Sequence, residues 1–131
     1  MADTVDTKVI RNGPRYYVAR FQNQSDGTGE TNVAKVTTSA LTTWDGKTCT
    51  YTTIERIEYA IQGFTQVRLH WDHTTNDEIA TLSGSGVIDL SSEGGMTDPK
   101  SAGDAGNILL TTVSPAAGAS YDITIWLRKK A

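Results

Sequence analysis

Both histidines of the chain fall in one short stretch that also carries acidic side chains. His70, Asp72 and His73 stand within four residues of one another, and Asp77 and Glu78 follow closely. Imidazole and carboxylate groups are the ligands that zinc and other divalent metals take in proteins. On a strand His70 and Asp72 project from the same face, and His73 begins the loop beyond it. This stretch is the candidate metal site of the chain.

The same stretch has a second interpretation, as the solvent-exposed face of a strand. Its polar residues alternate with Val67, Leu69 and Trp71, which is the pattern of a strand buried on one face only. The residues from Asp72 to Asp77 are rich in turn formers and fit a hairpin loop. We favour this interpretation and predict that the histidines hold no catalytic metal and that the protein uses no cofactor.

Cys49 is the second candidate for chemistry, as a thiol nucleophile assisted by a histidine. A catalytic thiol needs an electropositive or helix-terminal setting that lowers its pKa. Cys49 instead lies among threonines and a tyrosine, in a segment with strand character. We therefore predict that Cys49 is a small buried side chain.

Other catalytic patterns are absent from the sequence or incomplete. No nucleophile elbow of a serine hydrolase occurs. The run Ser83–Gly86 lacks the lysine of a phosphate-binding loop. Glu55 and Glu58 flank Arg56, but their spacing alone does not make an acid–base pair, and we interpret them as solvated charges. The sequence thus favours a binding protein over an enzyme.

The tryptophans differ in their surroundings. Trp71 lies on the apolar face of its segment and is expected in the core. Trp126 alternates with Ile123 and Ile125, so we expect it on an outer face or between layers. Trp44 lies in a polar, turn-like stretch, where it either forms part of a protein interface or folds back over one end of the domain.

Composition excludes several classes of function. The chain has 131 residues, 37% of them apolar, a net charge of −3 and a single cysteine. No stretch approaches the roughly 20 apolar residues of a membrane-spanning helix, and the only basic cluster is the terminal Arg128–Lys130. We expect no membrane partner, no nucleic-acid partner and no intrachain disulfide. The first residues lack the pattern of a signal peptide, so we expect synthesis in the cytoplasm.

Apolar and polar residues alternate with a period of two along much of the chain, which indicates half-buried antiparallel strands. The clearest alternation lies in Gln66–Asp72, Ser120–Arg128 and Tyr16–Gln22. Around Ile54–Ile61 the isoleucines also fit helical spacing, but the flanking threonines and Gly63 favour a strand. Weaker strands are predicted at Thr4–Ile10, Thr31–Thr38, Cys49–Thr53, Glu78–Ser83, Gly86–Leu90 and Asn107–Val113.

Turn signals separate the predicted strands at short, regular intervals. Examples are Asp26-Gly27, Asp45-Gly46 and Ser83-Gly84. Short strands at this spacing predict an all-β sandwich or barrel, and we expect one domain over residues 1–131 with about eight strands. The longest irregular stretch is predicted at Ser91–Gly106.

Several segments together resemble a family of small virion proteins of tailed bacteriophages. They are Asn12–Ala19, Asp26–Glu30, Val36–Leu41, Val67–Asp72, Gly94–Thr97, Gly106–Thr112 and the final Tyr-Asp-Ile-Thr-Ile strand. Proteins of this family are called head decoration or cement proteins. The resemblance implies an antiparallel, jelly-roll-like β-sandwich that binds the outer shell of the major capsid protein in many copies and stabilises the head. It implies a virion protein assembled in the host cytoplasm, with lattice or homo-oligomeric contacts and without catalytic residues.

Other structural roles fit the same features. A phage tail or head-completion protein would share them, and a carbohydrate-binding sandwich would also carry aromatic residues and polar loops. For the partner interface we expect Trp44 and the N-terminal segment Met1–Lys8, which acts as an arm or pairs with a neighbour's sheet edge. The strand-forming residues for such pairing are Thr4, Val5, Val9 and Ile10.

Overall fold

Ten strands and no helix make up the part of the chain that the structure describes. The computed structural model describes residues 4–13, 15–38, 41–43, 46–49, 51–72, 77–90, 92, 94–97, 107–113 and 117–130. The strands are β1 (Thr4–Asn12), β2 (Tyr16–Asp26), β3 (Val33–Val36), β4 (Tyr51–Gln62), β5 (Gln66–Trp71), β6 (Asp77–Leu82), β7 (Ser85–Asp89), β8 (Met96–Thr97), β9 (Ile108–Val113) and β10 (Ala117–Lys130).

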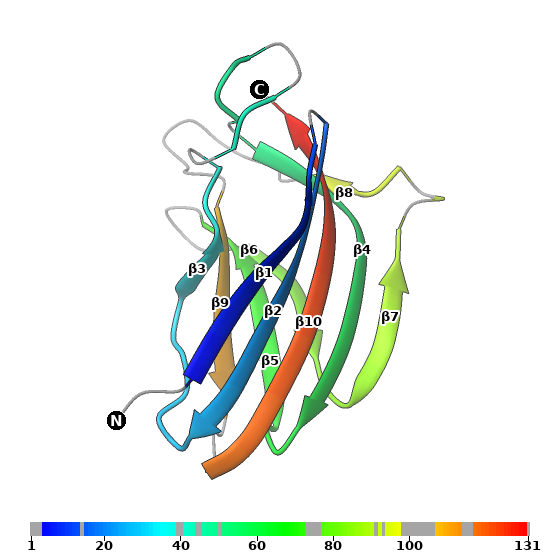
Figure 1. The fold of residues 1–131 in the computed structure, drawn as a ribbon. Helices are drawn as coiled ribbons and strands as arrows, with labels where there is room; N and C mark the ends of the chain where they lie inside the picture. The colour runs from blue at the N-terminus through cyan, green and yellow to red at the C-terminus, as the bar shows by residue number, and fades with distance from the viewer. Residues whose placement is uncertain are drawn as a thin grey trace.

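The strands form two sheets that face each other as an antiparallel, jelly-roll-like sandwich (Figure 1). The larger sheet has the order β1-β2-β10-β4-β7, and β8 pairs with β4 beside this path. The smaller sheet has the order β3-β9-β5-β6. Every pairing is antiparallel. The predicted fold class is confirmed.

The predicted alternation decides which face of each strand is buried. In β5 the side chains of Val67, Leu69 and Trp71 are at most 1% exposed, while the residues between them are half-buried. The last strand buries its own alternating set in the same way. The core between the sheets includes Tyr17, Ala19, Phe21, Ile57, Leu82, Ile108, Leu110, Tyr121, Ile123, Ile125 and Leu127.

A bulge in β4 accounts for the helix-like spacing of isoleucines in its sequence. The segments predicted at Cys49–Thr53 and Ile54–Ile61 are largely one strand, β4. Leu127 of β10 pairs with Ile54, and Trp126 pairs with Arg56, so Glu55 is an extra residue in β4. Such a bulge shifts the alternation by one residue. Ile54 and Ile57 therefore both face the core despite their helix-like spacing.

Two boundaries differ from the prediction. β3 spans four residues, Val33–Val36, where a longer strand was expected. The short strand β8 lies inside the stretch predicted to be irregular, and it pairs with Thr53 and Ile54. Much of the remaining Ser91–Gly106 stretch lies outside the described residues.

Candidate protein-binding surface

Exposed apolar side chains gather on β1, the strand at one edge of the larger sheet. Val5 is 49% exposed, Val9 52% and Ile10 61%, and they are three of the six large exposed hydrophobic residues in the described part of the chain. Val5 and Val9 pair with the buried residues Asn23 and Ala19 of β2, so they point to the core side of the sheet. The smaller sheet therefore covers them only in part.

The free side of β1 is also open to hydrogen bonding. β1 ends the order of the larger sheet, with β2 as its one neighbour among the described strands (Figure 1). An edge strand presents a row of unpaired backbone N–H and C=O groups. We call this row, together with Val5, Val9 and Ile10, the β1 edge. Thr4, Val5, Val9 and Ile10, which the sequence predicted as interface residues, all belong to this strand.

The structure changes how the N-terminal segment can act. From Thr4 onward its backbone is already paired with β2, so this part is not a free arm. What another chain can reach is the opposite side of β1. Residues 1–3 lie outside the described residues.

A β-bulge shapes the end of this surface. The register with β2 shifts between Val9 and Arg11, which leaves Ile10 as the extra residue. Bulges bend a strand and re-aim its side chains. Ile10 lines a hollow on the outer face of the larger sheet, together with Trp126 and Val87. The apolar surface thus continues from the core side of β1 around to the outer face.

Charges of both signs stand on the outward side of β1. The side chains of Asp6 and Lys8 are 59% and 61% exposed, and their charged groups are 3.9 Å apart. Lys8 lies beside Arg20, which donates two hydrogen bonds to the Asp122 carboxylate. The hydrogen bond from Arg20 is the main cause that lowers the pKa of Asp122, and Lys8 adds a smaller effect. Asp122, on β10 and two strands in from the edge, is therefore ionised at neutral pH and paired with Arg20.

The aromatic rings on the outer face already have partners. Arg56 lies over the Trp126 ring at 5.3 Å from its centre, and Arg11 lies over the Tyr16 ring at 5.5 Å. Cation–π contacts of this kind occupy one face of each ring. Trp126 is half-buried on the outer side, one of the two places that the sequence left open for it. A sugar-binding platform would need such faces free.

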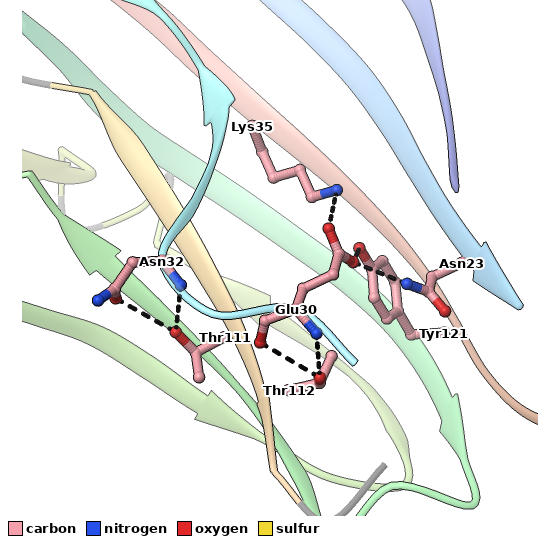
Figure 2. Close-up of polar contacts among 7 residues, drawn as sticks. All are labelled: Asn23, Glu30, Asn32, Lys35, Thr111, Thr112 and Tyr121. Atoms are coloured by element: carbon pink, nitrogen blue, oxygen red, sulfur yellow. Dashed lines mark hydrogen bonds and ion pairs between the residues drawn. The ribbon is translucent and has the colours of Figure 1, made fainter. Parts of the chain in front are cut away.

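A buried ionic network lies inside the sandwich (Figure 2). Oε2 of Glu30 lies 2.6 Å from Nζ of Lys35, and both side chains are less than a tenth exposed. Oε1 of Glu30 accepts hydrogen bonds from Asn23 Nδ2 at 2.7 Å and from the Tyr121 hydroxyl at 2.5 Å. Each carboxylate oxygen is thus occupied by groups of the protein.

The backbone of Glu30 extends this network to the other sheet. Its N–H donates to Thr112 Oγ1 at 2.8 Å, and its carbonyl accepts from the Thr112 N–H at 2.9 Å. The connection between β2 and β3 is thereby tied to β10 and to β9 at once. Sequence reasoning missed this cluster, because Glu30 stands 91 residues from Tyr121 and 82 from Thr112. Its enclosure and saturated bonding make it a structural clamp.

The residues of the candidate metal site are distributed over two strands, with His70 on β5 and Glu78 on β6. His70 is half-buried on β5, and burial lowers its pKa, with a further effect from Arg68. Glu78 opposite His70 is held by Arg68 at 2.8 Å and by Thr81, which lowers the pKa of Glu78 to about 2. His73 lies outside the described residues. Within the described part of the chain, no three His, Cys, Asp or Glu residues form a metal-binding group.

The surroundings of Trp44 are partly defined, although Trp44 itself lies outside the described residues. The flanking segments form a small hairpin, in which Thr42 bridges Thr48 and the Thr43 N–H donates to the Lys47 carbonyl at 2.8 Å. Cys49 is buried at its base, as predicted.

Lys129 fastens this hairpin to the turn after β1. Its ammonium donates to Asn12 Oδ1 at 2.5 Å and to the carbonyls of Gly13 and Thr42 at 2.8 and 3.0 Å. Burial lowers the pKa of Lys129. The described segment at Thr42 and the end of β1 are therefore held in one fixed arrangement.

Comparisons with known proteins show no family for this chain. No protein-family model matches it, and no curated protein matches its sequence. Among solved structures, a cupin domain from Bordetella pertussis Tohama I is 7% identical with a TM-score of 0.40, over 100% of this chain and 98% of that one. A mutant of a family 29 carbohydrate binding module is 8% identical with a TM-score of 0.41, over 96% and 92%. A cupin superfamily protein from Desulfitobacterium hafniense DCB-2 is 12% identical with a TM-score of 0.39, over 95% and 78%.

No helix among the described residues meets the length and apolarity of a membrane span.

Proposed function

We propose that the protein is a decoration protein of a tailed-bacteriophage head, which binds the outer shell of the major capsid protein and stabilises it. One observation carries the protein-binding part of this proposal. It is the β1 edge, where Val5, Val9 and Ile10 are about half or more exposed on a strand whose outer side has no neighbour among the described strands. An exposed apolar edge is a hazard unless it is a contact surface. The resemblance to head decoration proteins supports the phage setting, with assembly in the host cytoplasm.

The rest of the molecule suits a reinforcing role. Two antiparallel sheets with a continuous core, and the Glu30 clamp between them, make a stiff body. Many copies held on one shell convert weak single contacts into strong overall binding. Lys129 binds both Thr42, which precedes the predicted contact Trp44 in the sequence, and Asn12 at the end of β1, so these two described parts of the surface are held together.

Two other functions remain as alternatives. A tail or head-completion protein would use the same sandwich and the same edge, and it differs in where it sits and in how many copies it has. A carbohydrate-binding module would use the hollow that Ile10, Trp126 and Val87 line on the outer face. The Arg56 guanidinium over the Trp126 ring argues against that use.

The test is saturation binding of the purified protein to undecorated phage shells. We expect the wild type to bind at a fixed number of copies per shell. The triple variant Val5→Ser/Val9→Ser/Ile10→Ser should bind at least about tenfold more weakly, since three exposed apolar side chains lose their burial in the complex. Trp44→Ala should weaken binding as well.

Val87→Ser is the control for the core-side residues Val5 and Val9, because Val87 is 53% exposed on β7, at the opposite edge of the same sheet, and shares the outer hollow only with Ile10 of the three. It should bind like the wild type. A wild-type protein that does not bind shells would overturn the decoration proposal. The number of copies in purified phage particles separates the two phage roles. Hundreds of copies indicate a shell protein, and about a dozen indicate a tail or head-completion protein. Retention on immobilised polysaccharides, lost in Trp126→Ala, would favour the carbohydrate alternative.

A further inference from the structure

We propose that the partner of the β1 edge is the β1 edge of a second copy of this chain, paired antiparallel about a twofold axis through Thr7. This inference rests on the proposed function only in taking the β1 edge as a contact surface. It adds the identity of the partner and the register of the contact. The two larger sheets would then join into one continuous sheet across neighbouring copies.

The geometry of strands limits where such an axis can lie. Hydrogen-bonding groups alternate in direction along a strand, so a symmetric antiparallel pair must be centred on a residue and not between two residues. The regular part of β1 runs from Thr4 to Val9, because the register breaks at the bulge after Val9. Asp6 and Thr7 are the central residues of this six-residue run, and Lys8 follows them.

Charge selects among these three centres. An axis at Asp6 would place Asp6 opposite its own copy, and an axis at Lys8 would do the same for Lys8. Like charges directly opposite each other destabilise a strand pair. An axis at Thr7 instead places Asp6 opposite Lys8 of the second copy, twice by symmetry. The sequence of β1 is therefore self-complementary about Thr7.

The apolar residues agree with the same register. With the axis at Thr7, Val5 stands opposite Val9 of the second copy, and Thr7 stands opposite its own copy. Directly opposed side chains in an antiparallel pair point to the same face. Val5, Thr7 and Val9 share the core side, since they pair with the buried Asn23, Phe21 and Ala19. Valines thus meet valines on the core side, and opposite charges meet on the outer side.

This contact is small, so it is expected to be weak in dilute solution. Copies that sit side by side on a shell have a high effective concentration, which favours it. The pairing would also close an edge that is otherwise open to unspecific strand addition.

Disulfide trapping tests the register directly, in the Cys49→Ala background to remove the native thiol. Under mild oxidation at high protein concentration, Thr7→Cys should form a covalent dimer. Opposed Cβ atoms in a strand pair are about 4.5–5.5 Å apart, within reach of a disulfide after small adjustment. Val5→Cys and Val9→Cys alone should not dimerise, because four residues of offset separate like positions by about 13 Å. A mixture of these two variants should cross-link.

Charge substitutions in the Thr7→Cys protein supply a second test. Asp6→Lys alone and Lys8→Asp alone should each cross-link at least about fivefold less than the parent, because each places like charges opposite each other. Mixing these two variants should restore cross-linking, as a heterodimer. Equal cross-linking by all single cysteine variants, or single charge variants that behave like the parent, would overturn the proposal.

The same variants separate this inference from the proposed function. If the protein binds shells but Thr7→Cys gives no dimer, either in solution or on the shell, the self-pairing proposal is rejected. The decoration proposal is then unaffected. If the β1 variants then also lose shell binding, the edge is taken by the shell protein. A dimer that forms in the correct register without any shell binding would reject decoration and leave the self-pairing intact.

Discussion

The Glu30 carboxylate lies inside the sandwich with a partner for each oxygen. Lys35 takes one oxygen, while Asn23 and Tyr121 share the other. Removing water from a charged pair is costly, so such a pair adds less to stability than its short distances suggest. Its partners come from three separate parts of the chain, and its role is to fix how the β2–β3 connection crosses between the sheets.

The first prediction follows from that enclosure. Lys35→Met should lower the free energy of unfolding by about 3–5 kcal/mol, because it leaves a buried carboxylate without its cation. The control is the double variant Lys35→Met/Glu30→Gln, which removes both charges and should recover part of the loss. Urea unfolding measures both. A single variant no less stable than the double one would contradict the network.

A second prediction at the residue scale concerns His70. Burial and the charge of Arg68 lower the pKa of His70 below its ordinary value of 6.5. The unfolded chain therefore takes up this proton at a higher pH than the folded protein does. The stability that neutral His70 contributes is complete above pH 6.5 and is lost as the pH falls through the lower folded-state pKa.

Urea unfolding between about pH 7.5 and about pH 5.5 checks this pH dependence. The wild type should lose stability over that range, and His70→Gln should lose less. His73→Gln serves as the control, since it leaves His70 in place. If His70→Gln keeps the full pH dependence of the wild type, the proposed cause is wrong.

At the scale of the elements, the edge strands determine which backbone groups are exposed, and the turns between strands determine how closely neighbouring strands pack. β10 lies inside the larger sheet between β2 and β4, whereas β1 and β7 end it. The turn from β4 to β5 passes so close to β10 that a Cβ on Gly63 would lie 2.8 Å from Cβ of Ala119. Gly63 also has a φ of +86°, a conformation that residues with a side chain rarely adopt.

Gly63→Ala tests the importance of this close approach. It should lose about 1 kcal/mol from the backbone conformation and a further 1–3 kcal/mol from the contact with Ala119. Gly46→Ala is the matched control, because Gly46 has a φ of +82° and no atom within 4 Å of the added Cβ. It should lose only the first part, as measured by thermal or urea unfolding. Equal losses in the two variants would contradict the close packing.

On the scale of the whole molecule, the first and last strands are joined through β2, so the fold closes only when the two ends of the chain come together (Figure 1). Such long-range pairing makes folding slow compared with that of locally connected folds. It also makes stability uneven, since central strands open only with the whole domain while edge strands open locally.

Hydrogen exchange should show this gradient. Amides in the middle of β10, from Tyr121 to Leu127, should exchange most slowly, and those on the free side of β1 should exchange fastest among the strands. On decorated shells the β1 amides should become protected, while those of β7 should change little. Protection of β1 in the free monomer equal to that of β10 would contradict the sheet order.

The sequence by itself determined the fold class and the faces of the strands. Alternation in Gln66–Asp72 and Ser120–Arg128 correctly predicted which side chains are buried, because the direction of a side chain on a strand depends only on its position along that strand. It also identified Val5, Val9 and Ile10 as residues of a strand. For Ile54–Ile61 the predicted strand is confirmed, but alternation alone did not predict that Ile54 and Ile57 face the same side, because the bulge opposite β10 shifts it.

Only the tertiary structure decided the sheet order, and with it the open edge. A strand's pattern does not say which strand lies beside it, because pairing joins residues far apart in the chain, such as Lys8 with Arg20 and Thr124 with Glu58. The Glu30 clamp and the Lys129 contacts depend on the same long-range closure. Among the described strands β1 has no neighbour on one side, and its valines are about half exposed; both are properties of the assembled sheet and not of β1 itself.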